Sequence, residues 1–385
     1  MQPSPSMPPP LRAIRAEIEQ GRPDDSNLAA LKMVWQASLA RARAQIPDIC
    51  IESDGEIVHL GGISPGCAAC KAGTWDCIFI TQRCNLTCEF CYSPLALLPD
   101  DAGSAFGSTP EQIAGMHART RITGISFSGG EPFLEPQKLL EWVSWFRQHH
   151  PEQYSWVYTN GLLAEAGILQ ELGKLGLEEI RFNMAASNYN NPKVLQNLAA
   201  AVECIPNVTV EIPSIPVHAG KLFASLPEWS ARGVKYLNLH ELIYEPGSLS
   251  GSMAGERQMV ILPDGHQNCI DPASRDLTLA VMQKVAEEHL PLAVNDCSLQ
   301  SKLLQMRGRR RSLSPLTREP YEKLVGDETL ESFCLYRDER DYHFCHPDAF
   351  PETRIRFPNY KVVKIVREAP LALTGKNKWI ACEDY

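Results

Sequence analysis

Between residues 77 and 239 the chain alternates short apolar runs with longer segments of helical spacing, and this rhythm limits the folds that it can adopt. Regular strand–helix alternation indicates a parallel sheet with helices packed on it, because each strand must return to the same edge before the next begins. The runs predicted as strands are Cys77–Thr81, Gly124–Ser128, Ser155–Thr159, Glu179–Asn183, Val208–Ile215 and Val234–Leu239.

Six such units are fewer than the eight of a closed barrel. We therefore expect an α/β fold built on an open, partial (β/α)6 barrel, with its working face at the carboxyl ends of the strands. A helical N-terminal extension and a small mixed C-terminal lobe flank it. The expected domains are a Pro-rich tail and helical extension (1–49), a Cys/Gly-rich lead-in (50–76), the partial barrel (77–311) and the mixed lobe (312–385).

Within the six units, helices are expected over 136–149 and 162–175. Outside them, helices are expected over 11–20, 26–45 and 275–288, and strands over 50–59, 259–262, 292–295 and 360–366.

The positions of the cysteines indicate which chemistry the chain performs. Of thirteen cysteines, six fall between Cys67 and Cys91, which in a reducing compartment indicates metal or iron–sulfur ligation. Cys84-x3-Cys88-x2-Cys91 directly follows the first predicted strand. Three thiolates on one tight loop can ligate three irons of a [4Fe-4S] cluster and leave the fourth iron open. A zinc knuckle with one more ligand is the alternative.

A second motif, Ser128-Gly129-Gly130-Glu131-Pro132, ends the second predicted strand, and its glycines allow the backbone to approach a ligand closely. Together, the three cysteines and this GGEP segment resemble the radical S-adenosylmethionine (SAM) superfamily. The resemblance implies that Gly129, Gly130 and Glu131 contact the SAM methionyl group and that Phe90 lies near adenine. It also implies SAM contacts for Asn160, in Thr159-Asn160-Gly161, and for Asn183 after the fourth strand, where the sequence departs from the commoner serine pattern.

The resemblance implies an enzyme that cleaves SAM reductively to a 5′-deoxyadenosyl radical, which abstracts hydrogen from a small metabolite or a peptide side chain. It also implies an external one-electron reductant of the flavodoxin or ferredoxin type. Two later segments, 236–242 and 295–298, are loosely similar to the group near pyruvate formate-lyase activating enzymes. An activase for a glycyl-radical enzyme is therefore the alternative function.

Two other functions have weaker support. No cobalamin-binding Asp-x-His-x-x-Gly segment is present, which disfavours a radical methylase. A non-catalytic iron–sulfur electron carrier needs no SAM site, so the GGEP segment disfavours that class.

Several further side chains are candidates for a site. Cys50, Cys67, Cys70 and Cys77 could hold a second metal or iron–sulfur centre, although Cys77 on a strand could simply be buried. His240 and Glu241 end the sixth strand at the working face; because neighbours on a strand point to opposite faces, one at most should face the cavity. We favour His240.

Two more groups have open interpretations. Four late cysteines could bind an auxiliary cluster, but their spacing matches no recognised pattern: Cys269, Cys297, Cys334 and Cys345. The basic run 307–311 could clamp a carboxylate or phosphate, or could be a solvated helix end.

The net charge and the hydropathy of the chain disfavour two kinds of partner, nucleic acid and a membrane. A net charge of −9 disfavours non-specific binding to nucleic acid. No apolar run is long enough for a membrane span, and the Pro-rich start lacks the features of a signal peptide. We expect a soluble, cytoplasmic enzyme.

Overall fold

The computed structural model describes residues 10–20, 26–91, 109–245, 248–253, 255–261, 267–326, 328–370 and 378–385. They form two compact units. The barrel unit contains the described residues of 26–260 and 267–304. The C-terminal unit contains those of 1–25 and 305–385, together with Ile261.

A nine-stranded sheet forms the centre of the barrel unit, in the order β1-β2-β11-β8-β7-β6-β5-β4-β3. The consecutive strands β3 to β8 are parallel, and β11 joins β8 in parallel, whereas β2 and β1 extend the edge in antiparallel register. The expected α/β fold with a parallel barrel sheet is confirmed. The strands are β1 (Ile49–Glu52), β2 (Ile57–Leu60), β3 (Trp75–Thr81), β4 (Gly124–Gly129), β5 (Tyr154–Thr159), β6 (Glu179–Phe182), β7 (Asn207–Ser214), β8 (Tyr236–Glu241) and β11 (Ala293–Cys297).

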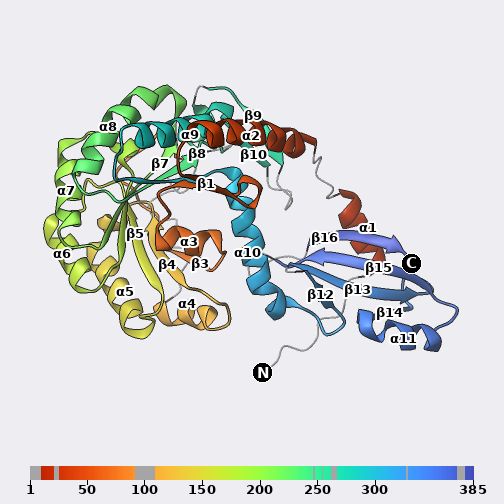
Figure 1. Ribbon diagram of the computed structural model, residues 1–385. Coiled ribbons are helices and arrows are strands. Elements are labelled where there is room, and N and C mark those ends of the chain that lie inside the picture. The colour runs from red at the N-terminus through yellow and green to blue at the C-terminus, as the bar shows by residue number, and fades with distance from the viewer. Residues whose placement is uncertain are drawn as a thin grey trace. The chain divides into compact units, whose positions relative to one another are not determined.

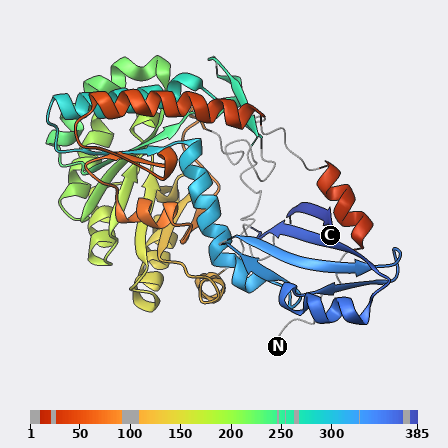
Figure 2. The ribbon, with the colours of Figure 1, turned by 45° about the vertical axis from the view of Figure 1, so that its right-hand side comes forward.

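Helices cover the outer face of this sheet, as Figures 1 and 2 show for α5 to α8. Several begin at a proline in the first turn, where the missing N–H costs no hydrogen bond. The helices of the barrel unit are α2 (Ser26–Gln45), α3 (Pro65–Lys71), α4 (Pro110–His117), α5 (Pro136–His149), α6 (Ala166–Lys174), α7 (Pro192–Val202), α8 (Ala219–Ala231) and α9 (Pro272–Glu287), and the unit also contains the start of α10 (Leu299–Thr317).

The two faces of each strand have different partners, as β4 illustrates. Ile125 and Phe127 are fully buried, and the Phe127 ring lies 6.2 Å from that of Phe146 on α5. Ser126 points the other way and accepts a hydrogen bond of 2.9 Å from the Trp75 indole. The outer face therefore packs on helices, while the inner face is more polar.

Helix α3 lies inside the curve of the sheet (Figure 1). A Cβ on Gly66 would come within 2.4 Å of Arg181 on β6, and one on Gly124 of β4 within 2.7 Å of Ala69. Cys67 accepts a hydrogen bond of 2.9 Å from Asn238 on β8. Because one short helix contacts strands across half of the sheet, α3 fills the interior toward the amino ends of the strands.

The C-terminal unit contains a five-stranded sheet in the order β12-β13-β15-β16, with β14 paired to β13. One side of α1, carrying Leu11, Ile14 and Ile18, packs with Val363 and Trp379 of this sheet. Its elements are α1 (Leu11–Gln20), the end of α10, α11 (Phe350–Arg356), β12 (Lys323–Val325), β13 (Thr329–Tyr336), β14 (Tyr342–Cys345), β15 (Lys361–Glu368) and β16 (Lys378–Asp384). A separate two-stranded sheet pairs β9 (Gln258–Ile261) with β10 (Gln267–Ile270).

The structure differs from the sequence expectations in three places. The strand expected over 50–59 is a hairpin, because Ser53 and Asp54 adopt left-handed backbone angles that reverse the chain. The lead-in contains a helix, α3, whose N-cap is Ser64. The expected helical extension is divided, since α1 packs in the C-terminal unit and α2 in the barrel unit.

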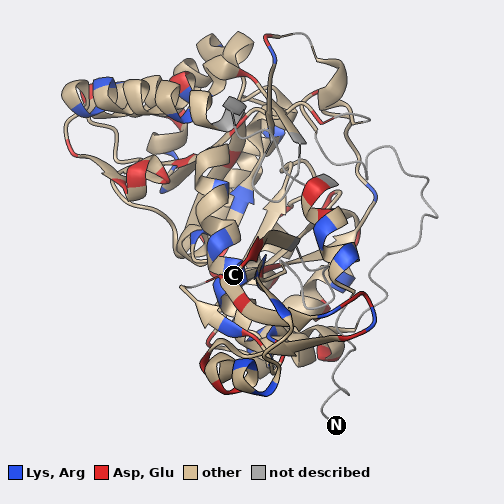
Figure 3. Cartoon of the chain, turned by 90° about the vertical axis from the view of Figure 1, so that its right-hand side faces the viewer, with Lys and Arg blue, Asp and Glu red and all other residues tan. Residues whose placement is uncertain are grey.

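Acidic and basic residues are interspersed along the chain, as the colours of the cartoon in Figure 3 show. In the basic run, Arg310 is 4% exposed and pairs with Glu368 at 2.8 Å. Arg310 therefore pairs within the C-terminal unit. It is the member of the basic run for which the structure shows a structural partner in place of a bound carboxylate or phosphate. Within the described residues, no helix is long and apolar enough to cross a membrane.

Candidate iron–sulfur and SAM site

The loop after β3 carries Cys84, Cys88 and Cys91 at the carboxyl edge of the sheet. Cys84 is exposed, and the other two are partly buried, with the Cys91 N–H donating to the Cys88 carbonyl at 3.0 Å. Burial raises the pKa of Cys88 to about 12, and the nearby Cys84 and Cys91 thiols add to the shift. The three thiols thus influence one another electrostatically, and their residue type and spacing suit the thiolate set of a cluster with one open iron. Among the described residues, these three included, no three His, Cys, Asp or Glu side chains stand in a metal-binding arrangement.

The GGEP segment holds this loop through its backbone. The Gly130 N–H donates to the Thr81 carbonyl at 2.9 Å, and the Glu131 N–H donates to that of Arg83 at 2.8 Å. A Cβ on Gly129 or Gly130 would come within 2.0 or 1.9 Å of these same carbonyl oxygens. The two glycines are therefore required because the backbone passes close to the segment that leads into Cys84. The sequence analysis had instead expected them to allow close approach to a ligand.

Glu131 joins the ends of three strands. Its carboxylate, 1% exposed, accepts hydrogen bonds from the Thr159 hydroxyl at 2.8 Å and from the Asn160 N–H at 2.7 Å. Burial raises the pKa of this carboxyl. The Asn160 side chain in turn donates to Asn85 Oδ1 at 2.7 Å. The segments expected to contact SAM are thereby fixed to the cysteine loop.

The remaining predicted SAM contacts lie on the same edge or next to the cysteines. Phe90 is 8% exposed and packs in the core of the barrel unit. Asn183 follows β6, where its side chain accepts a hydrogen bond of 3.2 Å from the Ala186 N–H and caps a short 3-10 helix. Their roles toward SAM stay predictions.

A buried chain of charged side chains crosses the inner face of the sheet, and the sequence analysis did not predict it. Arg181 on β6 donates to Glu179 at 2.8 Å and to Glu211 on β7 at 2.6 Å. His240 on β8 bonds the other oxygen of Glu211 at 2.7 Å. Arg181 and Glu211 lie on the neighbouring strands β6 and β7, and only the tertiary fold shows that they share an interior face.

His240 is the accessible end of this chain, with 26% of its side chain exposed. Burial opposes its charged form, but the neighbouring Cys297 and Glu211 outweigh that effect and raise the pKa of His240 to about 10. Burial would also raise the pKa of Glu211, yet Arg181 and His240 hold it well below its ordinary value. His240 is therefore an imidazolium at neutral pH.

Glu241 points to the opposite face of β8. It is 3% exposed, accepts a hydrogen bond of 2.7 Å from the Leu299 N–H at the start of α10, and does not belong to the charge chain. Burial raises the pKa of Glu241 to about 7. Of the two predicted polar residues, His240 faces the interior, and a catalytic role for either stays a prediction.

The four cysteines proposed for a second metal centre lie on three elements. Cys50 is on β1 and bonds Glu52, Cys67 and Cys70 are on α3, and Cys77 is on β3. Within the described parts of the chain, no three His, Cys, Asp or Glu side chains converge in a metal-binding arrangement. A second centre stays a prediction.

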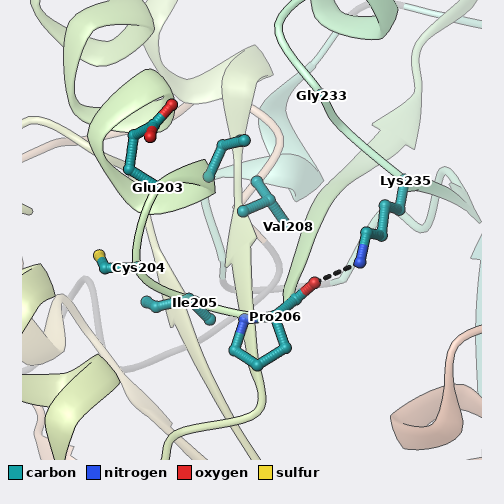
Figure 4. Close-up of a pocket in the computed structure, with 8 residues that line it drawn as sticks. Glu203, Cys204, Ile205, Pro206, Val208, Gly233 and Lys235 are labelled. Carbon is teal, nitrogen blue, oxygen red and sulfur yellow. Dashed lines mark hydrogen bonds between the residues drawn. The ribbon is translucent and has the colours of Figure 1, made fainter.

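A pocket of about 310 Å³ lies away from these residues (Figure 4). Its lining includes Glu203, Cys204, Pro206 and Lys235, from the segments that lead into β7 and β8. It is thus at the amino ends of parallel strands, opposite the cysteine loop.

Comparison with known proteins agrees with the site. The family described as "4Fe-4S single cluster domain" matches residues 72–173, which contain all three loop cysteines and the GGEP segment. The site and this match define the chain as a radical SAM enzyme whose cofactors are a [4Fe-4S] cluster and SAM.

Its relatives are of two kinds. A protein of Methanocaldococcus jannaschii named as a candidate glycyl-radical enzyme activating enzyme is 24% identical over 288 residues, covering 72% of this chain and 74% of that protein. The PqqA peptide cyclase of Gluconobacter oxydans is 33% identical over 104 residues, 27% of this chain and 28% of the cyclase.

Among solved structures, SuiB of Streptococcus suis bound to S-adenosylmethionine is similar at 12% identity, with a TM-score of 0.41. The match covers 58% of this chain and 50% of SuiB.

Proposed function

We propose that the enzyme removes a hydrogen atom from a residue of a polypeptide that enters the barrel at the carboxyl ends of the strands. The observation that carries this proposal is the bonding of the cysteine loop to the ends of β4 and β5 through Glu131 and the Asn160–Asn85 pair. It favours one fixed position for radical formation at the barrel mouth. When bound, the cluster and SAM supply a carbon radical able to break an unactivated C–H bond.

The chain's own residues position the substrate and keep water out. Helix α3 fills the amino end of the interior, so a substrate is expected to enter from the opposite edge. At that edge His240, held by Glu211, offers an imidazolium that could donate a proton to a bound substrate.

The names of the relatives favour a polypeptide over a small metabolite. One kind is named for a glycyl radical on an enzyme, and the other for the peptide PqqA. An activase is the second candidate, since the relative named for that activity matches over most of both chains. A reductant of the flavodoxin or ferredoxin type would deliver the electron.

The test uses anaerobic, cluster-loaded protein reduced with dithionite and given SAM with candidate peptides deuterated at their side chains or α-carbons. Transfer of deuterium into 5′-deoxyadenosine is expected from a peptide. Transfer only from a deuterated small metabolite would overturn the polypeptide proposal. A glycyl-radical signal in a partner enzyme after incubation would select the activase.

A further inference from the structure

Two cysteines outside the cluster loop occupy the barrel interior with different environments. Cys297 is the last residue of β11 and lies opposite His240, the register partner of Cys297 on the neighbouring strand β8. Both residues are partly exposed, and both lie toward the carboxyl end of the sheet. A thiol and an imidazole are thus neighbours at the edge where substrate is expected.

The surroundings of Cys297 favour its thiolate. Burial alone would raise its pKa, but His240 and the ammonium groups of Lys71 and Lys302 lower it below the ordinary value. Glu211 bonds His240 at 2.7 Å and keeps that ring charged and oriented. This is the arrangement in which a cysteine reacts as a nucleophile near neutral pH.

Cys70 approaches the same place from α3. The next residue, Lys71, donates hydrogen bonds to the Asp296 carbonyl at 3.1 Å and to the Ser301 hydroxyl at 2.5 Å. These bonds join the end of α3 to the backbone beside Cys297. Burial raises the pKa of Cys70 well above its ordinary value, and the nearby Cys297 raises it further.

Cys67, the other cysteine of α3, is less suited to react. It is 5% exposed, and its sulfur accepts a hydrogen bond from Asn238 at 2.9 Å. Burial raises the pKa of Cys67 to about 11.

We propose that Cys297 and Cys70 form a redox-active dithiol that exchanges with small disulfides, with Cys297 as the attacking and Cys70 as the resolving thiol. An activated thiolate and a partly buried thiol whose pKa is raised have the asymmetry that two-step exchange requires. This inference does not depend on the substrate or activity proposed above.

The exchange balances without any further reactant. The Cys297 thiolate attacks one sulfur of a disulfide RS–SR, a Cys297–SR bond forms, and the released RS⁻ takes a proton from the His240 imidazolium. Cys70 then attacks the Cys297 sulfur, its own proton passes to the second RS⁻, and the Cys70–Cys297 bond forms. The small disulfide gains two electrons and leaves as two thiols, while the dithiol is oxidised. The product would fasten α3 to the end of β11.

The test treats anaerobic, cluster-loaded full-length protein with bis(2-hydroxyethyl) disulfide, since cluster iron protects the loop cysteines. Mass spectrometry of digests should find Cys70 linked to Cys297. The Cys70→Ser variant should stop at a mercaptoethanol adduct on Cys297. Cys204 is the internal control, because it is also partly exposed while burial raises its pKa. Adduct formation on Cys297 should be at least roughly tenfold faster than on Cys204.

The His240→Gln variant tests whether Cys297 reacts because His240 stabilises its thiolate or only because its sulfur is exposed. The variant should slow adduct formation on Cys297 by roughly tenfold and leave the rate on Cys204 unchanged. The proposal is overturned if Cys297 reacts no faster than Cys204, or if the wild-type adduct persists without a Cys70 link. Loss of iron from the Cys70→Ser or Cys297→Ser variant would also overturn it, since these sulfurs would then be ligands.

Discussion

The side-chain amide of Asn160 donates a hydrogen bond of 2.7 Å to Oδ1 of Asn85, the residue that follows Cys84. It joins the end of β5 to the cysteine loop after β3, two strands away in the sheet. The position of the cluster is therefore set partly by a residue outside the loop.

Replacing Asn160 by Ala should loosen the cluster. One lost hydrogen bond of about 1 kcal/mol corresponds to about fivefold faster release of iron. The measurement is iron transfer to a chelator from anaerobic protein. The control is Asn207→Ala, because Asn207 bonds the Tyr154 hydroxyl at 3.0 Å near the amino end of the sheet. Equal release from wild type and both variants would contradict the argument.

Gly130 should not tolerate a side chain. In Gly130→Ala the new Cβ would lie 1.9 Å from the Arg83 carbonyl oxygen, so the loop must move, at a cost of about 2 kcal/mol. Gly167→Ala is the matched control, since nothing lies within 4 Å of its Cβ and Ala favours the helix. Urea midpoints followed by tryptophan fluorescence should fall for the first variant only. A midpoint for Gly130→Ala at or above that of Gly167→Ala would refute this reading.

Glu241 should make stability depend on pH. Its pKa is raised from 4.5 to about 7 in the folded protein, so the folded state binds the proton more tightly. Its contribution is complete below pH 4.5 and is lost as the pH rises through 7, by up to about 3 kcal/mol. Relative to wild type, Glu241→Gln should become more stable between these pH values. A stability difference that stays constant from pH 4.5 to 7.5 would be inconsistent with a raised pKa.

The sequence predicted the fold where local patterns determine it. The six parallel strands and helices such as α5 lie within a few residues of their expected positions, because apolar periodicity and first-turn prolines mark them. It could not predict α3, because PGCAACK has too few large apolar residues to show a helical stripe. Its small residues suit the interior, where Gly66 and Ala69 allow it to approach β6 and β4.

The candidate site also has parts that the sequence could predict and parts that it could not. The cysteine loop and GGEP are contiguous motifs, so sequence identified them. The partners of Glu131 and His240 depend on strand order: Glu211 is 29 residues from His240 along the chain yet 2.7 Å from it in space. The bond from Lys71 on α3 to the Asp296 carbonyl beside Cys297 likewise spans 225 residues of the chain, so no local pattern could predict it.

The central claim is a cluster, held by Cys84, Cys88 and Cys91, that leaves one iron open to SAM. Electron paramagnetic resonance of reduced, oxygen-free protein before and after addition of SAM tests it most directly. Wild type should hold about four irons at this site and change its spectrum when SAM is added, and the Cys84→Ala/Cys88→Ala/Cys91→Ala variant should lose both properties. Bound zinc in place of iron, or a cluster spectrum that SAM leaves unchanged, would contradict the account.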